Sequence, residues 1–307
     1  MHGMKWVDEQ TVLQRADIVQ LAAEMKDFLR QGGRERALLP PREVLFQQDP
    51  EAIYVSMPAA SVDCGLYINK VGSIFPRAAG DSLPTVHACV VAMSARHGRP
   101  LALLDGAALT RIKCAAVAAM VTDQCAIADA HTLTICGTGV QAWQQYLAVT
   151  AVRPIQTIRV YARRPEAAAA FVAAIRQHTP KPLILQVETD LEQAIAGADV
   201  VATATSAESP LGEFARLQPH VHINCMGGHN EQSRELPWSV LQSALVLTED
   251  VPMAIAEAGE VHQQAHPLEA LLTIPAQTLQ AQRTVFSSIG HAWLDLLATA
   301  HVLQRLD

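Results

Sequence analysis

A glycine-containing segment near the middle of the chain limits the possible folds more than any other feature. The short apolar segment 133–136 is rich in residues that favour β-strands, and G-T-G-V-Q-A follows it directly at residues 137–142. Residues 141–152 have a helical pattern, and residues 158–161 form a second short β-prone segment. This order of strand, glycine turn, helix and strand predicts a βαβ unit of the kind that binds dinucleotides.

The small residues of this turn each have a physical role in such a unit. Gly137 permits a tight turn, Gly139 lets the backbone approach a pyrophosphate, and Ala142 keeps the helix close to its strand. The N–H groups of the first helical turn, together with the helix dipole, favour a bound phosphate. We therefore assign to the cofactor site Gly137, Thr138, Gly139, Val140 and Gln141.

The residues after the second predicted strand distinguish between the two nicotinamide cofactors. An NAD site usually has Asp or Glu there, which hydrogen-bonds the ribose 2′-hydroxyl. This chain has Ala162, Arg163 and Arg164 instead, which favours the 2′-phosphate of NADP(H). The alternatives are NAD(H) and a pair of arginines that only face solvent. The predicted cofactor site also includes, from later in the chain, Thr203, Ala204, Met226 and Gly227.

The length and composition of the chain restrict its class. Its 307 residues, of which 50% are hydrophobic, are enough for two domains with a large core. A net charge of -7 without a basic run argues against nucleic acid and anionic membranes as partners, because both are polyanionic. The start of the chain is too short and polar for a signal peptide, and no apolar run approaches the roughly 20 residues of a membrane span. We therefore expect a cytoplasmic protein.

The cysteine and histidine residues do not form metal-binding or disulfide patterns. The six cysteines are scattered without a C-x-x-C pair, mostly in apolar surroundings typical of buried free thiols. His262 and His266 have a helical spacing, but no glutamate follows the first histidine as in H-E-x-x-H. Gly259 and Pro267 make this region look like a loop. We expect neither disulfides nor a metal site.

The order of the predicted elements separates two kinds of architecture. The first part of the chain combines a helical segment at residues 8–33 with short β-prone segments between residues 43 and 104. After a helix at 109–128, strands alternate with helices, which predicts a parallel, doubly wound sheet. The predicted fold class is α/β: a Rossmann-type doubly wound sheet plus an α+β domain.

Three cations in the first part of the chain lie in apolar or turn-like surroundings. Arg42 follows Leu-Pro-Pro, Lys70 lies in a predicted strand, and Lys113 lies in an apolar helical segment. A single cation of this kind usually extends its charge to solvent. Three of them in a domain that accompanies a nucleotide-binding fold suggest a clamp for a substrate carboxylate.

Several segments give the chain a resemblance to a known family. They are Pro41-Arg42, Asn69-Lys70, Leu104-Asp105-Gly106 with Leu109-Thr110, GTGVQAWQQYL, HINCMGG at 222–228, Arg234-Glu235-Leu236, and Thr284-Val285-Phe286 before Gly290. On these segments the chain resembles the ornithine cyclodeaminase/mu-crystallin family from about residue 10 to its end. The resemblance implies a Rossmann domain inserted into a substrate-binding domain that forms a homodimer, with NAD(H) or NADP(H) as the cofactor.

The resemblance also implies domain boundaries and substrate ligands. The substrate-binding and dimerisation domain would comprise residues 1–114 with 289–307, and the dinucleotide-binding domain residues 115–288. Arg42, Lys70 and the residue at 113 would hold the substrate carboxylate. Most family members have arginine at that last position. Lys113 keeps the charge but loses the bidentate geometry of a guanidinium group.

A second departure from the family follows the HINCMGG segment. Ornithine cyclodeaminases have an aspartate there that receives the distal amine of the substrate, whereas this chain has His229. An imidazole does not pair with an ammonium group as a carboxylate does. The mu-crystallin/ketimine reductase branch also lacks the aspartate, which favours a reductase. Glu231 could compensate, so a cyclodeaminase stays open as an alternative.

The resulting hypothesis is an NAD(P)H-dependent oxidoreductase that transfers a hydride to or from the α-carbon of a small cyclic imino acid or 2-amino acid. This is the reaction of ketimine and pyrroline-2-carboxylate reductases. Lys70 or His229 would be catalytic and would supply or remove the proton on nitrogen, unless His229 only caps a turn. The first alternative is an ornithine cyclodeaminase, which releases ammonia without net cofactor turnover. The second is a non-catalytic protein that binds NADPH or another ligand, as mu-crystallin does.

Overall fold

The computed structural model describes residues 4–75, 83–227 and 234–306, and the chain divides into two compact units. Unit 1 comprises Met1–Lys113 and His291–Asp307, and unit 2 comprises Cys114–Gly290. Both ends of the chain therefore belong to unit 1. None of the helices in the described ranges has the length and apolar character needed to cross a membrane.

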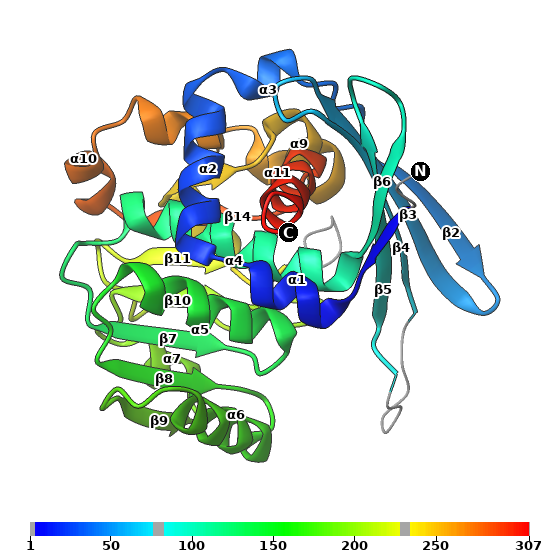
Figure 1. The fold of residues 1–307 in the computed structure, drawn as a ribbon. Coiled ribbons are helices and arrows are strands. Elements are labelled where there is room, and N and C mark those ends of the chain that lie inside the picture. The colour runs from blue at the N-terminus through cyan, green and yellow to red at the C-terminus, as the bar shows by residue number, and fades with distance from the viewer. Residues whose placement is uncertain (1–3, 76–82, 228–233, 307) are drawn as a thin grey trace. The chain divides into compact units, whose positions relative to one another are not determined.

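A six-stranded sheet is the largest element of unit 1 (Figure 1). Its order is β1-β6-β5-β4-β3-β2, and its strand pairs are antiparallel apart from β1 with β6. The strands are β1 (Lys5–Val7), β2 (Glu43–Gln48), β3 (Glu51–Ser61), β4 (Leu66–Ile74), β5 (Val86–Ser94) and β6 (Pro100–Asp105). The sequence predicted all of these strands except β1, which was missed because its three residues are too few to show an alternating pattern.

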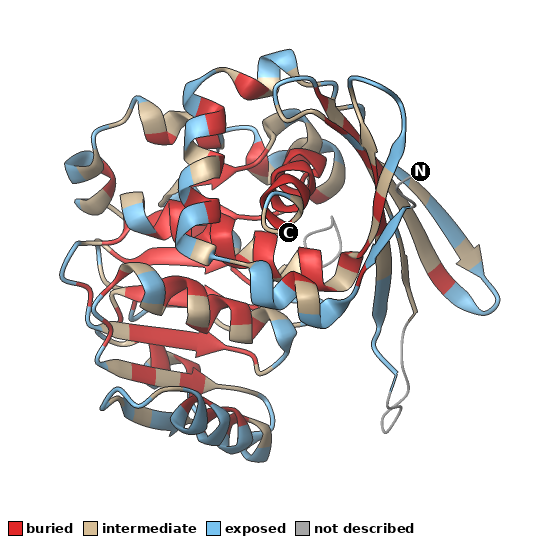
Figure 2. Cartoon of the chain, in the orientation of Figure 1, coloured by how far each residue is buried: buried red, intermediate tan, exposed pale blue. Residues whose placement is uncertain are grey.

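The helices of unit 1 include one that is almost wholly buried. They are α1 (Glu9–Arg15), α2 (Ile18–Arg30), α3 (Gly33–Arg36), α11 (Ala292–Leu303) and the first part of α4 (Gly106–Cys125). Asp17 caps α2, because its carboxylate accepts the N–H of Gln20 at 2.9 Å. The buried helix is α11, which packs against α2, β3 and β4 (Figure 2). A buried helix of this kind is expected to be apolar on every side.

Unit 2 contains an eight-stranded sheet in which every strand pair is parallel, with the order β13-β12-β14-β11-β10-β7-β8-β9. The strands are β7 (Thr132–Cys136), β8 (Thr157–Tyr161), β9 (Ile184–Glu188), β10 (Val200–Thr203), β11 (His222–Cys225), β12 (Leu245–Thr248), β13 (His266–Pro267) and β14 (Thr284–Ser287). The chain winds from β7 through β8 to β9 and then returns to the other side of β7 at β10. This arrangement confirms the predicted doubly wound α/β class, and it creates a topological switch point between β7 and β10.

The helices of unit 2 include two that the sequence pattern did not predict. Besides the rest of α4, its α-helices are α5 (Val140–Val152), α6 (Pro165–His178), α7 (Leu191–Ile195), α8 (Trp238–Gln242), α9 (Val251–Ala258) and α10 (Ala276–Gln280). Both α9 and α10 were missed, and the region between Gly259 and Pro267 that was expected to be a loop contains a short 3-10 helix at Glu260–His262 and the strand β13. Asp250 caps α9 by accepting the N–H of Met253 at 2.9 Å. Pro252 lies in the first turn, where a missing N–H group does not weaken a helix.

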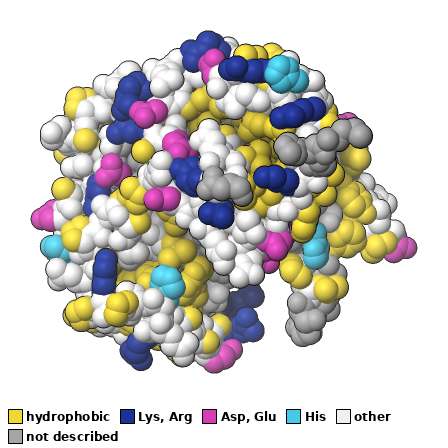
Figure 3. All heavy atoms as spheres, viewed as in Figure 1, with side chains coloured by type: hydrophobic (Ala, Val, Ile, Leu, Met, Phe, Trp, Pro, Cys, Tyr) yellow, Lys and Arg dark blue, Asp and Glu magenta, His cyan; other side chains and the backbone are white. Residues whose placement is uncertain are grey.

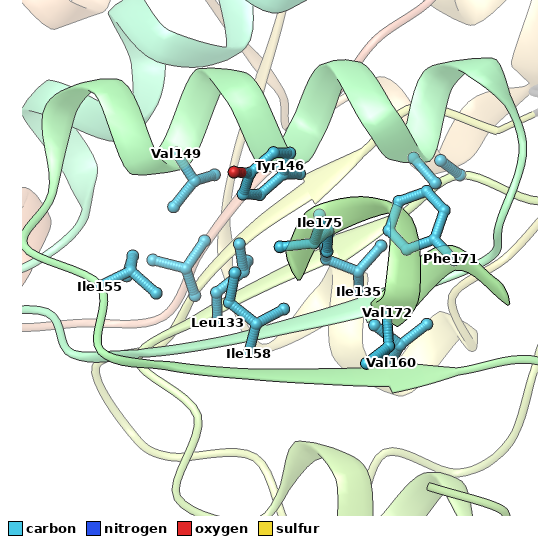
Figure 4. Close-up of a cluster of buried hydrophobic side chains, with 14 of the residues drawn as sticks. Leu133, Ile135, Tyr146, Val149, Ile155, Ile158, Val160, Phe171, Val172 and Ile175 are labelled. Atoms are coloured by element: carbon cyan, nitrogen blue, oxygen red, sulfur yellow. The ribbon is translucent and has the colours of Figure 1, made fainter. Parts of the chain in front are cut away.

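A compact apolar core explains why the βαβ unit folds as the sequence predicted. Leu133 and Ile135 of β7 and Ile158 and Val160 of β8 are fully buried beneath α5 (Figure 4). Ala142 of α5 is also fully buried, as expected for a residue at the close approach of helix and strand. The alternating residues of both strands therefore hold the turn at 137–139 at the carboxyl edge of the sheet.

Candidate functional site

A pocket with a volume of about 1000 Å³ lies at the carboxyl ends of β7, β8 and β10 in unit 2. This position coincides with the switch point of the sheet, where parallel α/β sheets bind their ligands. The residues that line it come from the turn after β7, the start of α6 and the segment after β10. They include these predicted cofactor residues: Gly137, Thr138, Gly139, Ala162, Arg163, Arg164 and Ala204.

The two glycines of the turn differ in the reason why a glycine is suitable. Gly137 has a φ of +115°, and a Cβ there would overlap the carbonyl group of Ala204, so the fold itself requires glycine. Gly139 has an extended backbone, and a Cβ there would meet no protein atom within 4 Å. That Cβ would instead occupy space in the pocket. A glycine at 139 therefore fits a ligand that approaches the backbone closely, as a pyrophosphate does.

The start of α5 and the nearby arginines give this pocket a positive character. Gly139 is the N-cap residue of α5 and, as a glycine, has no side chain that could accept hydrogen bonds from the first N–H groups of the helix. These N–H groups and the positive end of the helix dipole favour an anion. Arg163 and Arg164 are exposed and line the same pocket. The donors therefore fit the phosphate groups of a dinucleotide.

The other residues predicted to bind the cofactor are not among those that line this pocket. Residues 140 and 141 begin α5, and residues 226 and 227 follow β11 directly. Thr203 ends β10 and is fully buried, and its hydroxyl donates a hydrogen bond to Glu235 at 2.7 Å. The side chain of Thr203 is thus engaged within the protein.

A buried carboxylate that was not predicted as functional joins the ends of β10 and β11. Glu235 accepts hydrogen bonds from the N–H groups of Thr205 (2.6 Å) and Gly227 (2.8 Å). It also accepts from the hydroxyls of Thr203 and Thr205, both at 2.7 Å. A Cβ at Gly227 would overlap the carboxyl group of Glu235, so the carboxylate and the glycine fit one another. Because Thr205 lines the pocket, this network fixes part of the pocket wall.

In unit 1, two of the predicted substrate ligands meet at a single buried carboxylate. The Nζ atom of Lys70 lies 3.0 and 3.2 Å from the two carboxylate oxygens of Asp295. The Nζ atom of Lys113 lies 2.7 Å from Oδ2 of the same group. The hydroxyl of Thr110 donates to the carbonyl of Gly106 and accepts a longer hydrogen bond from Lys70 at 3.4 Å. The predicted cations thus form a cluster, with an acid at its centre.

The charges of this cluster do not cancel. Two ammonium groups face one carboxylate, which leaves a net positive charge when all three are ionised. Burial, together with the charge of Lys113, lowers the pKa of Lys70 to about 8, against the opposing attraction of Asp295. Burial alone would raise the pKa of Asp295, but Lys113 and Lys70 together hold it below its ordinary value. The cluster is therefore suited to attract an anion, and Lys70 can lose its proton near physiological pH.

The remaining residues predicted in the substrate site are not joined to this cluster by the contacts above. Arg42 lies directly before β2 and is half-buried. His229 and Glu231 lie outside the described residues. The structure therefore brings Lys70 and Lys113 together, and the roles of Arg42 and His229 stay predictions.

Sequence reasoning did not identify Asp295 or Glu235 as functional, although the sequence around Asp295 contains a signal. Asp295 is a lone acid within an apolar helical segment, between Leu294 and Leu296. Acids are rarely buried without a partner, so an acid at such a position indicates a buried cation nearby. Glu235 was noted for its resemblance to the family, but nothing in its neighbourhood in the sequence indicates its partners.

Comparisons with known proteins agree with this architecture. Residues 3–307 match the sequence profile of the ornithine cyclodeaminase/mu-crystallin family. The chain is 29% identical to the Delta(1)-pyrroline-2-carboxylate reductase of Bacillus cereus, over 97% of this chain and 94% of that protein. It is 27% identical to the ketimine reductase mu-crystallin of Rattus norvegicus, over 93% and 96% of the two chains.

A solved structure shows the same fold. The Thermococcus litoralis Delta(1)-pyrroline-2-carboxylate reductase, in complex with NADH and L-proline, superposes with a TM-score of 0.90 at 21% identity. The alignment covers 98% of this chain and 97% of that one. Because the family profile spans nearly every residue, this protein belongs to the ornithine cyclodeaminase/mu-crystallin family.

Proposed function

We propose that the protein is an NAD(P)H-dependent reductase of a small cyclic imino acid, of the pyrroline-2-carboxylate or ketimine type. The observation that carries this proposal is that one chain combines a glycine turn at a switch-point pocket with a buried cluster of net positive charge. The two reductases that match over more than nine-tenths of their length support the same reaction.

Lys70, Arg42 and His229 have proposed parts in this reaction. A reduced nicotinamide, when bound, supplies a hydride to the α-carbon of the imine. Lys70 and Arg42 attract and orient the substrate carboxylate. Lys70 also donates the proton that the ring nitrogen needs, because its pKa of about 8 keeps it mostly charged at neutral pH while its proton stays mobile. The C=N bond thus gains one hydride and one proton and becomes an amine. His229 is the alternative proton donor.

The proposed activity is tested by following NADPH oxidation with pyrroline-2-carboxylate and piperideine-2-carboxylate, while ammonia release from L-ornithine is measured in parallel. We expect oxidation with the imines and no ammonia from ornithine. Ammonia release without net cofactor oxidation would instead identify a cyclodeaminase. Binding of NADPH without turnover of any of these compounds would identify a binding protein.

A matched pair of glycine variants tests the cofactor pocket. Gly139→Ala places a methyl group where no protein atom lies within 4 Å. We therefore expect an unchanged melting temperature and a dissociation constant for NADPH that rises by about tenfold or more. Gly137→Ala should lower the melting temperature instead, because of its positive φ and the carbonyl of Ala204. Unchanged affinity in Gly139→Ala would remove the turn from the cofactor site.

We propose NADP(H) as the preferred cofactor, because Arg163 and Arg164 line the pocket at the end of β8. The double variant Arg163→Ser/Arg164→Ser should raise the dissociation constant of NADPH by about tenfold and leave that of NADH nearly unchanged. Fluorescence titration measures both constants. Arg176→Ser provides a control, because this arginine is exposed at the other end of α6. Equal losses for both cofactors would contradict the preference.

We also propose that a second copy of the chain covers the outer face of the unit 1 sheet. Lys70 faces Asp295 on α11, so Tyr67 and Val71, at odd positions of the same strand, face the opposite side. Tyr67 is 38% exposed, Val71 40% and Leu45 of β2 59%. Figure 3 shows exposed apolar side chains along this sheet. A sheet face of this kind is typical of an interface.

This interface is tested by light scattering of the purified protein and of a Tyr67→Glu/Val71→Glu variant. The wild type should have the mass of a dimer, and two carboxylates on each copy should convert it to a monomer. A wild type of monomer mass would contradict the proposal.

The thiols support a cytoplasmic location. All six cysteines lie in the described ranges and carry thiol groups rather than disulfide bonds, and three of them, Cys125, Cys136 and Cys225, are buried. Burial raises the pKa of Cys125 to about 12, which makes this thiol unreactive. Proteins with several free thiols are typical of reducing compartments, so we propose the cytoplasm.

A further inference from the structure

Asp295 lies at the centre of the cationic cluster of unit 1. It is delivered by α11, which packs against β3 and β4, and its side chain is fully buried. Both of its oxygens contact Lys70 from β4, and Oδ2 also contacts Lys113 from α4. An acid 225 residues away along the chain therefore supplies the negative charge for Lys70.

The three side chains of the cluster differ in their access to solvent. The side chain of Lys70 is 11% exposed, that of Lys113 is 3% exposed and that of Asp295 is 0% exposed. Lys113 also makes the shortest contact with the carboxylate, at 2.7 Å. Lys70 is thus the member of the cluster that a substrate arriving from solvent can reach. The ammonium group of Lys113 is instead turned to Asp295.

We infer that Asp295 is a positioning residue that fixes the ammonium group of Lys70 for the substrate, and that Lys113 acts by balancing Asp295 rather than by touching the substrate. This inference rests on the proposed reductase function. It differs from the role of substrate ligand that the family resemblance implies for residue 113. A lysine alone has a long, flexible side chain, whereas one held by both oxygens of a buried carboxylate has its N–H donors pre-oriented.

The charges around Lys70 make this inference testable. The charged groups that face Lys70 among the described residues are Asp295 from α11 and Lys113 from α4. Its register partners on β3 and β5, Met57 and Val90, are apolar. Attraction to Asp295 raises the pKa of Lys70, and repulsion by Lys113 lowers it, in addition to the larger lowering by burial. Neutralising the two partners should therefore move this pKa in opposite directions.

The test measures the ionisation of Lys70 directly in the full-length protein. The pH dependence of its acetylation by acetic anhydride, quantified by mass spectrometry of the peptide, reports the pKa of its amine. Asp295→Asn should lower that pKa and Lys113→Gln should raise it, each by about one unit. Lys113→Arg keeps the charge and should change it little.

Asp105→Asn is the matched control for Asp295→Asn, because it makes the same substitution at another aspartate of unit 1. Asp105 accepts the N–H of Ala108 at the start of α4, so an asparagine keeps this hydrogen bond. It should leave the pKa of Lys70 unchanged. Shifts of the same sign in Asp295→Asn and Lys113→Gln, or no shift in Lys113→Gln, would overturn the inference. Since Lys113→Gln alone decides this second outcome, the test holds even if Asp295→Asn does not fold.

Steady-state kinetics provide a second readout. Lys113→Gln should raise the KM for the imine by less than about threefold, and Lys70→Met should raise it by more than about tenfold. Equal increases in the two variants would show that Lys113 touches the substrate and would also overturn the inference. If the wild type reduces no imino acid, the proposed function fails, and the labelling experiment still decides the role of Asp295.

Discussion

The two units each bury a carboxylate completely, but they satisfy it in different ways. In unit 1, Asp295 is held by the ammonium groups of Lys70 and Lys113. In unit 2, the hydrogen bonds that Glu235 accepts from Thr203, Thr205 and Gly227 come from neutral N–H and O–H groups. Neutral donors hold a carboxylate in place and do not offset its charge, whereas an excess of cations leaves charge for a substrate.

Unit 2 repeats this use of neutral donors at a second buried acid. Glu249 is fully buried and accepts from the hydroxyl of Ser288 at 2.6 Å and from the N–H groups of Ile289 and Gly290 at 3.0 and 3.1 Å. Both acids of unit 2 thus organise the backbone where strands end. In unit 1, by contrast, Asp295 holds the side chains of Lys70 and Lys113. The buried acids of unit 2 therefore fix backbone positions, whereas the cluster of unit 1 keeps a net positive charge that suits an anion.

The largest effect should come from removing the accessible cation of unit 1. Lys70→Met eliminates both the proposed proton donor and a ligand of the substrate carboxylate. We expect kcat/KM for the imine to fall by about a thousandfold with a native circular dichroism spectrum. Activity within tenfold of the wild type would mean that another group transfers the proton. His229 would then be the next residue to substitute.

Loss of the acid in unit 1 should have the next largest effect. Asp295→Asn leaves two buried ammonium groups without a counter-charge, which should lower the free energy of unfolding by about 3–5 kcal/mol. Urea denaturation at pH 7 measures this change. The same experiment at pH 9.5 should show a smaller loss, because Lys70 is then mostly neutral. A loss that does not depend on pH would mean that the charges do not cause it.

A smaller effect is expected at the acid of unit 2. Glu235→Gln keeps the shape of the side chain but replaces one carboxylate oxygen with an NH2 group. This group cannot accept the hydrogen bonds that Thr203, Thr205 and Gly227 donate, so about one hydrogen bond is lost and one donor is left unsatisfied. The free energy of unfolding should fall by about 2 kcal/mol, without the pH dependence expected for Asp295→Asn. A loss larger than that of Asp295→Asn would reverse the comparison between the two units.

The smallest effect concerns another neutral network of unit 2. His222 is fully buried, with Nδ1 2.9 Å from the hydroxyl of Thr284 and Nε2 3.1 Å from Oδ1 of Asn224. Burial lowers the pKa of His222 to about 3 from its ordinary value of 6.5. Between these values the unfolded chain binds the additional proton, so stability is lost as the pH falls below 6.5.

His222→Gln removes this titration while it keeps a neutral polar side chain. The wild type should lose about 1 kcal/mol per pH unit more than the variant between pH 6 and pH 4. Urea denaturation of both proteins across this range provides the measurement. Parallel stability curves would show that folding does not lower the pKa of His222.

Short-range patterns in the sequence were enough to predict the fold class, the family and most of the strands. The segment from Leu133 to Tyr161 is an example, because its alternating apolar residues and the glycines at 137 and 139 determine backbone conformation locally. The strands β1 and β13 and the helices α3, α9 and α10 were missed, because segments this short show little periodicity. The assignments of Arg42, Arg163 and Arg164 to ligands remain predictions.

The sequence by itself predicted the glycine turn at residues 137–139 and two lysines in the domain that accompanies it. The tertiary structure alone decided that Lys70 and Lys113 share Asp295, and that Glu235 holds the ends of β10 and β11. The physical reason is the range of the interactions. Turn geometry and hydrophobic periodicity are set within about 15 residues, whereas the partner of a buried charge depends on how distant segments pack.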